Sequence, residues 1–311
     1  MRPGRTRSAA RSAARLVYED ELILAYDKPV GLPVIAPDGS RSRCLLDVAS
    51  EQVRRRNPKG RAAVVHRIDR DTSGIVVFAR DARAKRLLMS GWDEIVSERL
   101  YVALVEGEMG SSEGELDSFL VEDARGFVRE AGPRERGAKR ALSRWRVIAE
   151  GRGMSLLEVR LETGRKHQIR VQLAGIGHPV VGDERYGGRA RYGREARGEA
   201  PREGERSASR PRPVSSPTLA RLCLHAAAIE LRLPESSGSV RIESSAPPEF
   251  AEALGKRSAS SESAGRDRPP ARGGGSDITE RAPRELRPGR FNGPRDGGPA
   301  SRRGGPRRGR R

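Results

Sequence analysis

The sequence predicts a mixed α+β fold built on a mainly antiparallel sheet with flanking helices and loops. Stretches with strand character outnumber helical ones, and few strand–helix–strand units are evident. Apolar periodicity is good over residues 16–182 and almost absent from residues 189–217 and 255–311. We therefore expect one domain over residues 16–254 with a flexible basic insertion at 189–217. A basic N-terminal extension (1–15) and a disordered Arg/Gly-rich tail (255–311) would flank it.

The first elements of this domain are strands separated by turn residues. Residues 16–27 predict two short strands about the acidic turn Glu19-Asp20-Glu21, followed by the rigid loop Lys28-Pro29-Val30-Gly31-Leu32-Pro33. Residues 45–55 have helical periodicity. An apolar run at 62–65 enters a charged turn, and a second run at 75–80 leaves it, which predicts strand, turn and strand.

The later elements follow from similar patterns. Asp81 is placed to cap a helix that has Ala84, Leu87 and Leu88 on one face. Branched and aromatic residues predict a strand at 100–105. The remaining expected elements are a hairpin of 143–148 and 156–161 around Gly151 to Gly153, a short helix at 167–173 started by Thr163 or Gly164, strands at 222–233 and 240–242, and a short helix at 248–254.

The net charge of +19 comes from 61 basic and 42 acidic residues in a chain of 311. The tail from Lys256 to Arg311 has 16 basic and 6 acidic residues, so +10 of this charge lies there. Such a balance favours an anionic polymer as partner, and nucleic acid is the common one. The tail ends in an arginine–glycine segment that is typical of RNA binding without sequence preference, or of a solubilising appendage with no partner.

The two cysteines, Cys44 and Cys223, give neither a disulfide framework nor a zinc-binding spacing, which favours a reduced cytoplasm. No apolar run approaches the ~18 residues that a membrane span needs. The first 15 residues, rich in Arg, Ser and Ala, have a composition also found in transit peptides. We favour a basic extension of a cytoplasmic bacterial protein, because the same composition recurs at the C-terminus.

Two charged clusters are the most informative features. The turn His66-Arg67-Ile68-Asp69-Arg70-Asp71-Thr72-Ser73-Gly74 can hold a carboxylate rigidly at a sheet edge, where a ligand can reach it. About a hundred residues later comes Gly164-Arg165-Lys166-His167-Gln168-Ile169-Arg170. A carboxylate from the first cluster and a guanidinium from the second could form a buried pair that keeps the acid charged.

Several other chemistries find no support in the sequence. No pair of the four histidines has the close helical spacing of a zinc enzyme, and no carboxylate stands at a matching offset. No phosphate-binding Walker loop, dinucleotide-binding glycine motif or Gly-x-Ser-x-Gly elbow is present. We therefore expect neither a metal nor a nucleotide cofactor.

These clusters resemble the motifs of the RluA-type pseudouridine synthases. Residues 66–74 are similar to that family's His-Arg-Leu-Asp-x-x-Thr-Ser-Gly signature, with Ile68 in place of leucine. Further resemblances follow in family order over residues 16–250: Tyr18-Glu19-Asp20, Asp27-Lys28-Pro29-Val30-Gly31-Leu32 (with Asp27 where asparagine is usual), the strand Leu100 to Gly107, Thr163 to Arg170 (with Ile169 for leucine), Gly177-His178-Pro179, Gly182-Asp183, Tyr186-Gly187 and Leu224-His225-Ala226.

The resemblance implies the pseudouridine synthase fold with a catalytic cleft across the sheet, and isomerisation of uridine in RNA without a cofactor or metal. Asp69 matches the catalytic aspartate, acting as nucleophile or as base, and Arg170 matches its arginine partner. Tyr101 matches the residue that stacks on the uracil. Because the target base must leave its stack, base flipping is expected, and Arg67 matches a residue that enters the gap.

Further contacts to RNA are expected from residues in or near these motifs, namely Arg70, Arg165, Lys166, Ile169 and Lys28. His66 is expected to be a structural hydrogen-bonding residue of the turn. We expect a monomer that binds ribosomal or transfer RNA and does not associate with a membrane. No S4 RNA-binding domain fits before Leu16, so extra affinity would come from the catalytic domain, the insertion and the tail.

Two other functions remain open. A non-catalytic RNA-binding protein could keep this fold, although the presence of Asp69, Tyr101 and Arg170 argues against it. A metal-dependent nuclease is the weaker option, and sensitivity to EDTA would reveal it.

Overall fold

The computed structural model describes residues 14–187, 219, 221–233 and 238–255, all within the first of two units of the chain, Met1–Ser263. The predicted insertion at 189–217 and the tail from residue 256 onward lie outside the described residues, and so do the first 13 residues of the expected extension. We expected Arg15 in that extension, but it begins the first strand and pairs with Asp27. The predicted C-terminal boundary of the extension was therefore wrong.

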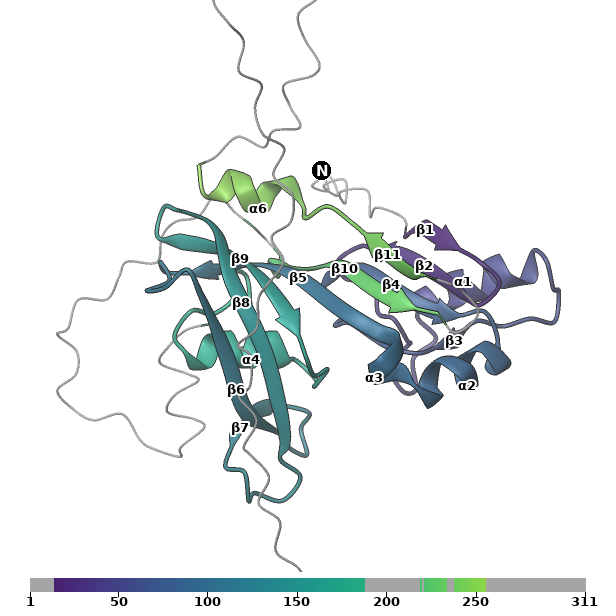
Figure 1. Cartoon of the computed structure of the whole chain (residues 1–311), viewed down its shortest axis with the longest axis horizontal. Coiled ribbons are helices and arrows are strands. Elements are labelled where there is room, and N and C mark those ends of the chain that lie inside the picture. The colour runs from purple at the N-terminus through teal and green to yellow at the C-terminus, as the bar shows by residue number, and fades with distance from the viewer. Residues whose placement is uncertain (1–13, 188–218, 220, 234–237, 256–311) are drawn as a thin grey trace, which may run out of the picture. The chain divides into compact units, whose positions relative to one another are not determined.

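The described residues form a mixed α+β fold on one large sheet, which confirms the predicted fold class (Figure 1). The strand order is β1-β2-β4-β10-β5-β9-β8-β6-β7, with β11 paired to β10 and β3 to β4. The strands are β1 (Arg15–Glu19), β2 (Ile23–Lys28), β3 (Ala63–Val64), β4 (Ser73–Ala79), β5 (Val96–Glu106), β6 (Glu113–Glu122), β7 (Val128–Ala131), β8 (Lys139–Gly151), β9 (Met154–Leu161), β10 (Leu224–Arg232) and β11 (Ser239–Glu243).

The described helices flank this sheet. They are α1 (Leu45–Arg54), α2 (Ala82–Ser90), α3 (Trp92–Ile95), α4 (Gln168–Gly175) and α6 (Pro248–Ala253). Asp81 caps α2 as predicted, because its side chain accepts a hydrogen bond from the Ala84 amide. Among the helices that the structure describes, none is both long and apolar enough to cross a membrane.

The apolar runs of β2 (residues 23–26) and β4 (residues 75–79) are buried because both faces of these strands are covered. Leu24 on β2 and Phe78 on β4 pack with α1 in one core, whereas Ile23 and Val77 pack with α2 in another. This alternation is the two-residue period of a strand. Each large apolar side chain buried in this way stabilises the fold by about 1.5–3 kcal/mol.

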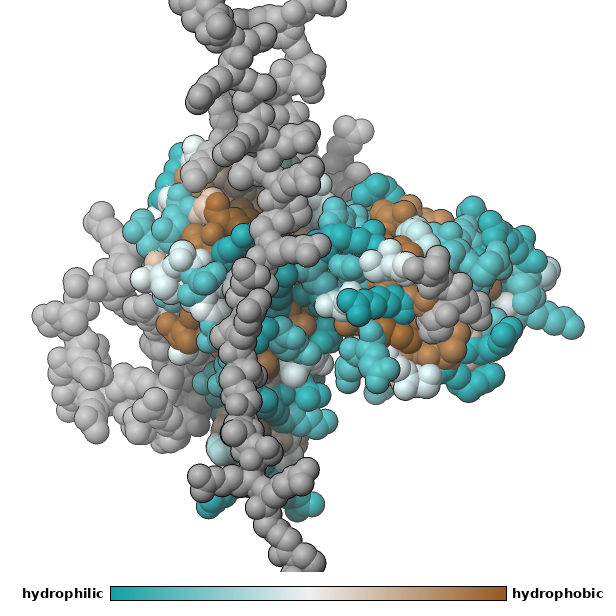
Figure 2. Space-filling view, viewed as in Figure 1, coloured by the Kyte–Doolittle hydropathy of each residue, from teal (hydrophilic) through white to brown (hydrophobic). Residues whose placement is uncertain are grey.

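Strand β5 joins the two ends of the sheet. It pairs with β10 along one edge and with β9 along the other, and Figure 1 shows it running from the β1–β2–β4 group to the β9–β8–β6 group. A separate core around β5, β9, α4 and α6 contains Leu104, Leu157, Leu173 and Phe250. On the face seen in Figure 2, hydrophilic residues surround several small apolar patches, in keeping with the high charge of the chain.

The sequence analysis missed α3 and the hairpin β6–β7. Side chains on β6 alternate between exposed and half-buried over much of its length, and Glu113, Glu115 and Asp117 are residues that strands disfavour. The hairpin is nevertheless held by its pairing to β8, which extends beyond the predicted 143–148 at both ends. Strand pairing therefore overrides local preference here.

Gly74 allows β4 and β10 to approach closely at the only parallel pairing among the described strands, where Gly74 lies opposite Ala226. Its φ is +108°, and a Cβ atom added there would lie 2.2 Å from the Ala226 carbonyl oxygen. Only glycine tolerates both conditions.

We expect Gly74→Ala to lower the free energy of unfolding by about 3 kcal/mol or more, because the methyl group meets backbone that cannot move aside. Gly39→Ala is the matched control, since Gly39 also has a positive φ (+73°) but nothing lies within 4 Å of the added Cβ. It should cost roughly 1–2 kcal/mol. Urea denaturation measures both, and equal losses in the two variants would contradict the steric explanation.

Candidate active site

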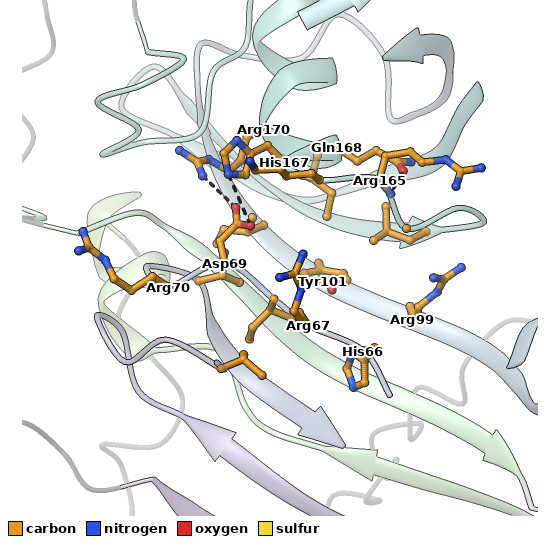
Figure 3. Close-up of a pocket in the computed structure, with 18 of the residues that line it drawn as sticks. His66, Arg67, Asp69, Arg70, Arg99, Tyr101, Arg165, His167, Gln168 and Arg170 are labelled. Carbon is orange, nitrogen blue, oxygen red and sulfur yellow. Dashed lines mark hydrogen bonds and ion pairs between the residues drawn. The ribbon is translucent and has the colours of Figure 1, made fainter. Parts of the chain in front are cut away.

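A cavity of about 650 Å³ lies over the middle of the sheet, where the two charged clusters meet (Figure 3). Its walls come from segments that are far apart in the sequence. They are residues 33–35 and Pro37, residues 65–70 and Thr72 of the turn, Trp92, Arg99 and Tyr101, and Leu161, residues 164–170 and Leu224.

The turn that carries Asp69 is fixed from several sides. His66 accepts a hydrogen bond at Nε2 from the Val77 amide, at 2.9 Å. The Arg70 carbonyl accepts two hydrogen bonds, from the Gly31 amide at 2.9 Å and from Lys28 Nζ at 2.8 Å. Because these contacts come from β4, from the last residue of β2 and from the loop after β2, the turn has little freedom to change its shape.

Asp69 and Arg170 form the ion pair that the two clusters predicted. Nη1 of Arg170 donates to Oδ2 of Asp69 at 2.8 Å, and the side chains are 11% and 25% exposed, respectively. The same guanidinium donates from Nε and Nη2 to the buried Asp183 at 2.7 and 2.9 Å. Burial lowers the pKa of Arg170, but hydrogen bonds and charge from Asp183 and Asp69 outweigh it and raise this pKa above its ordinary value.

Tyr101 lies on β5 below this pair and beside Arg67 (Figure 3). Burial, with a smaller contribution from the charge of Asp69, raises the pKa of Tyr101 to about 12, while Arg99 acts in the opposite direction. The phenol is therefore protonated at neutral pH and can donate a hydrogen bond. Its ring forms part of the cavity wall, where it can contact a flat ligand.

His167 is a cavity residue whose contacts the sequence did not predict. Its backbone has a positive φ of 55°, which is uncommon for a residue with a side chain. Nδ1 lies 2.7 Å from the Tyr186 hydroxyl, and Nε2 lies 3.8 Å from Oδ1 of Asp69. Burial, partly offset by the charge of Asp69, lowers the pKa of His167 to about 4, so the imidazole is neutral at pH 7.

Most of the residues expected to contact RNA do line the cavity. Arg67 and Arg70 are exposed on the turn, and Arg70 pairs with Asp71. Arg165 donates to the Arg140 carbonyl, and Lys166 pairs with Glu122. Ile169 is only 4% exposed and belongs mainly to the core around β5.

Lys28 is the exception, and its expected role in RNA binding was wrong. Its side chain is fully buried, and Nζ donates to the carbonyls of Pro29, Leu32 and Arg70 at 3.0, 2.9 and 2.8 Å. All three donors are used, so RNA cannot reach this amine. Burial lowers the pKa of Lys28 to about 7, although the charges of Asp71 and Asp69 oppose this shift. Lys28 instead ties the loop after β2 to the turn of Asp69.

The sequence analysis also missed Trp92, Arg99 and Asp183 as parts of the site. Trp92 and Arg99 line the cavity from α3 and β5, and Asp183 lies behind Arg170. Asp183 stood in a quoted motif, but its spacing of 13 residues from Arg170 matches no helical or strand period that would have revealed the contact. In the described part of the chain, no group of three or more His, Cys, Asp or Glu residues could hold a metal ion.

Comparison with known proteins identifies the family to which a chain with this fold and this ion pair belongs. A family model described as RNA pseudouridylate synthase matches residues 22–175. The ribosomal large subunit pseudouridine synthase D of Pseudomonas aeruginosa is 35% identical over 242 residues, which cover 76% of this chain and 69% of that protein. The chain therefore belongs to the family of RNA pseudouridine synthases, enzymes that convert uridine in RNA to pseudouridine.

Other relatives agree with this assignment. An uncharacterized RNA pseudouridine synthase of Aquifex aeolicus is 36% identical over 181 residues, although the match spans only 55% of each chain. The solved structure of human RNA pseudouridylate synthase domain containing 4 superposes with a TM-score of 0.57 at 23% identity, covering 77% of this chain and 91% of that one. At this identity the human structure establishes the shared fold alone.

The buried environment of His66 generates a prediction about acid stability. Burial, helped by the charge of Arg99, lowers the pKa of His66 to about 4, and protonation at Nε2 would remove the acceptor for the Val77 amide. The unfolded chain binds this proton with a pKa near 6.5. Between pH 6.5 and about 4 the unfolded state therefore binds more protons, and the free energy of unfolding falls as the pH falls.

We expect His66→Gln to remove roughly 2–3 kcal/mol of this acid-dependent loss, because glutamine can accept the same hydrogen bond but does not titrate. Urea denaturation of both proteins at pH 7, 6 and 5 measures the difference between the two slopes. Parallel pH profiles would mean that His66 does not titrate in this way.

Proposed function

We propose that this protein isomerises uridines in RNA to pseudouridine with Asp69 as the reacting carboxylate. In that reaction the bond from N1 to C1′ breaks, the uracil turns, and a bond from C5 to C1′ forms. C5 loses a proton and N1 gains one, so the product is an isomer of the substrate. The observation that carries the proposal is the ion pair of Asp69 with Arg170 at 2.8 Å, at the wall of a cavity in a member of this family.

The two oxygens of Asp69 have different surroundings, which suits this role. Oδ2 accepts from Arg170, whereas among the described residues Oδ1 has no hydrogen-bond donor and lies 3.8 Å from Nε2 of His167. Because His167 is neutral at pH 7, it does not neutralise this oxygen. Oδ1 is therefore the atom that attacks C1′ or removes a sugar proton.

The surrounding side chains supply the contacts that an everted uridine needs. A base inside a helix cannot reach Asp69, so the target nucleotide must flip into the cavity. Tyr101 stacks on the uracil and Arg67 enters the gap that the base leaves. Arg70, Arg165 and Lys166 line the same cavity and bring positive charge to the phosphates next to the target.

Asp69→Asn is expected to abolish tritium release from RNA labelled at C5 of uridine, because the amide is neither a nucleophile nor a base of comparable strength. Asp71→Asn is the matched control, since Asp71 lies in the same turn, is 45% exposed and pairs only with Arg70 among the described residues. It should keep the wild-type rate within about threefold.

Three other outcomes would reject this assignment. Equal tritium release by wild type and Asp69→Asn would exclude Asp69 as the reacting group. No release by the wild type from any cellular RNA pool, with RNA binding intact, would indicate a non-catalytic RNA-binding protein. Strand cleavage that EDTA abolishes would indicate a metal-dependent nuclease.

Ribosomal RNA of the large subunit is the substrate that we propose, because several bacterial relatives carry that name. We further propose that the enzyme acts in the cytoplasm, where bacterial ribosomal RNA is made.

A strain that lacks this gene is expected to lose one or more pseudouridines from its large-subunit rRNA, and a plasmid with the wild-type gene should restore them. A plasmid with the Asp69→Asn gene is the control that should not restore them. Mapping pseudouridines in total RNA measures the result. Loss confined to transfer RNA would overturn the proposed substrate while leaving the proposed reaction intact.

A further inference from the structure

Asp183 is buried behind the ion pair, in a rigid turn. Its side chain has no exposed surface, and its Oδ1 accepts hydrogen bonds from the amides of Arg185 and Tyr186 at 3.0 and 3.1 Å. Its own amide donates to the Val180 carbonyl at 3.1 Å, and its carbonyl accepts from the Gly187 amide at 2.7 Å. The turn therefore fixes the position of the Asp183 carboxylate independently of its contact with Arg170.

The guanidinium of Arg170 donates two hydrogen bonds to Asp183 and one to Asp69. Nε and Nη2 form a two-point contact with Asp183, at 2.7 and 2.9 Å, and only Nη1 is left for Asp69. The Tyr186 ring supports the same group from its face, with Cζ of Arg170 5.1 Å from the ring centre. A guanidinium held in two-point contact on one edge cannot offer that edge to another carboxylate.

We propose that Asp183 is a positioning residue for the isomerisation: it occupies one edge of Arg170, limits Asp69 to a single bond and leaves Oδ1 of Asp69 free for the substrate. This inference rests on the proposed function of Asp69. Without Asp183, Arg170 can turn and bind both oxygens of Asp69, which would neutralise the carboxylate and block the oxygen that reacts.

Charge leads to the same conclusion as geometry. The three groups together carry one net negative charge, so Arg170 is neutralised by Asp183 and Asp69 keeps its reactivity. The same buried turn also orients a second neighbour of Asp69, because Asp183 binds the amide of Tyr186, whose hydroxyl contacts His167. Asp183 thus acts on Asp69 through both of its neighbours without touching the substrate.

Asp183→Asn tests the proposal, because the amide oxygen can still accept from the turn while the bond to Nε of Arg170 is lost. We expect the rate of a single turnover at saturating RNA to fall by about 30-fold or more, with the Kd for RNA within threefold of wild type. The acid limb of the pH–rate profile should move to lower pH, because an Arg170 freed from Asp183 stabilises the ionised form of Asp69. The other titratable groups that face Asp69, which are Lys28, Tyr101 and His167, are unchanged in this variant.

Glu19→Gln is the matched control. Glu19 pairs with Arg80 at 2.8 Å, both side chains are mostly buried (14% and 12% exposed), and neither lines the cavity. This variant should lose thermal stability to a similar extent but keep the wild-type rate and pH profile. If Asp183→Asn fails to fold, Asp183→Glu replaces it, because the longer carboxylate keeps the charge and displaces the guanidinium, with an expected loss of about tenfold in rate.

A folded Asp183 variant with the wild-type rate and an unmoved acid limb would overturn the inference. A rate loss explained entirely by weaker RNA binding would also overturn it. A wild-type protein without activity would instead refute the proposed function, so the two failures are distinguishable.

Discussion

One ion pair depends on most of the fold. Asp69 and Arg170 are 101 residues apart, on a turn before β4 and on the first turn of α4, and they belong to neighbourhoods with separate hydrophobic cores. Strand β5 connects these neighbourhoods and places Tyr101 beneath the pair. The sheet therefore serves as the frame that holds two charges at bonding distance across a cavity, which neither segment could do alone.

Hydrogen bonds hold the basic side chains around this site in fixed positions. Three basic side chains at or behind the cavity wall have defined partners: Lys28 donates to three carbonyls, Arg170 donates to two carboxylates, and His66 accepts from the Val77 amide. A buried polar group without a partner costs free energy, and a loose one would not position anything. Among the described residues, Oδ1 of the partially exposed Asp69 has no hydrogen-bond donor, in line with the role proposed for it.

The sequence could predict the fold class and the pairing of Asp69 with Arg170, because both depend on patterns that stay local: strand runs, and two charged motifs. It could not predict the contact of Asp183 with Arg170, which arises from the path of the chain after α4. Lys28 was misjudged for a related reason. A lysine after a strand is usually solvated, whereas the end of β2 lies inside the domain, and only the tertiary structure reveals that burial. The strand β6 was missed because pairing with β8 overrides its unfavourable residues.

The parallel contact between β4 and β10 also affects how the chain comes to be folded on the ribosome. Strand β3 already pairs with Phe78 and Ala79 on the inner edge of β4, but Ser73 and its hydrogen-bonding neighbour His225 are separated by 152 residues. The Ser73–Gly74 end of that edge therefore has no partner until nearly the whole domain has been translated. At about 5–20 residues per second this interval lasts roughly 10–30 s. During that time this end of the β4 edge in the nascent polypeptide is open to other chains, and ribosome-associated chaperones are the cellular factors suited to shield it.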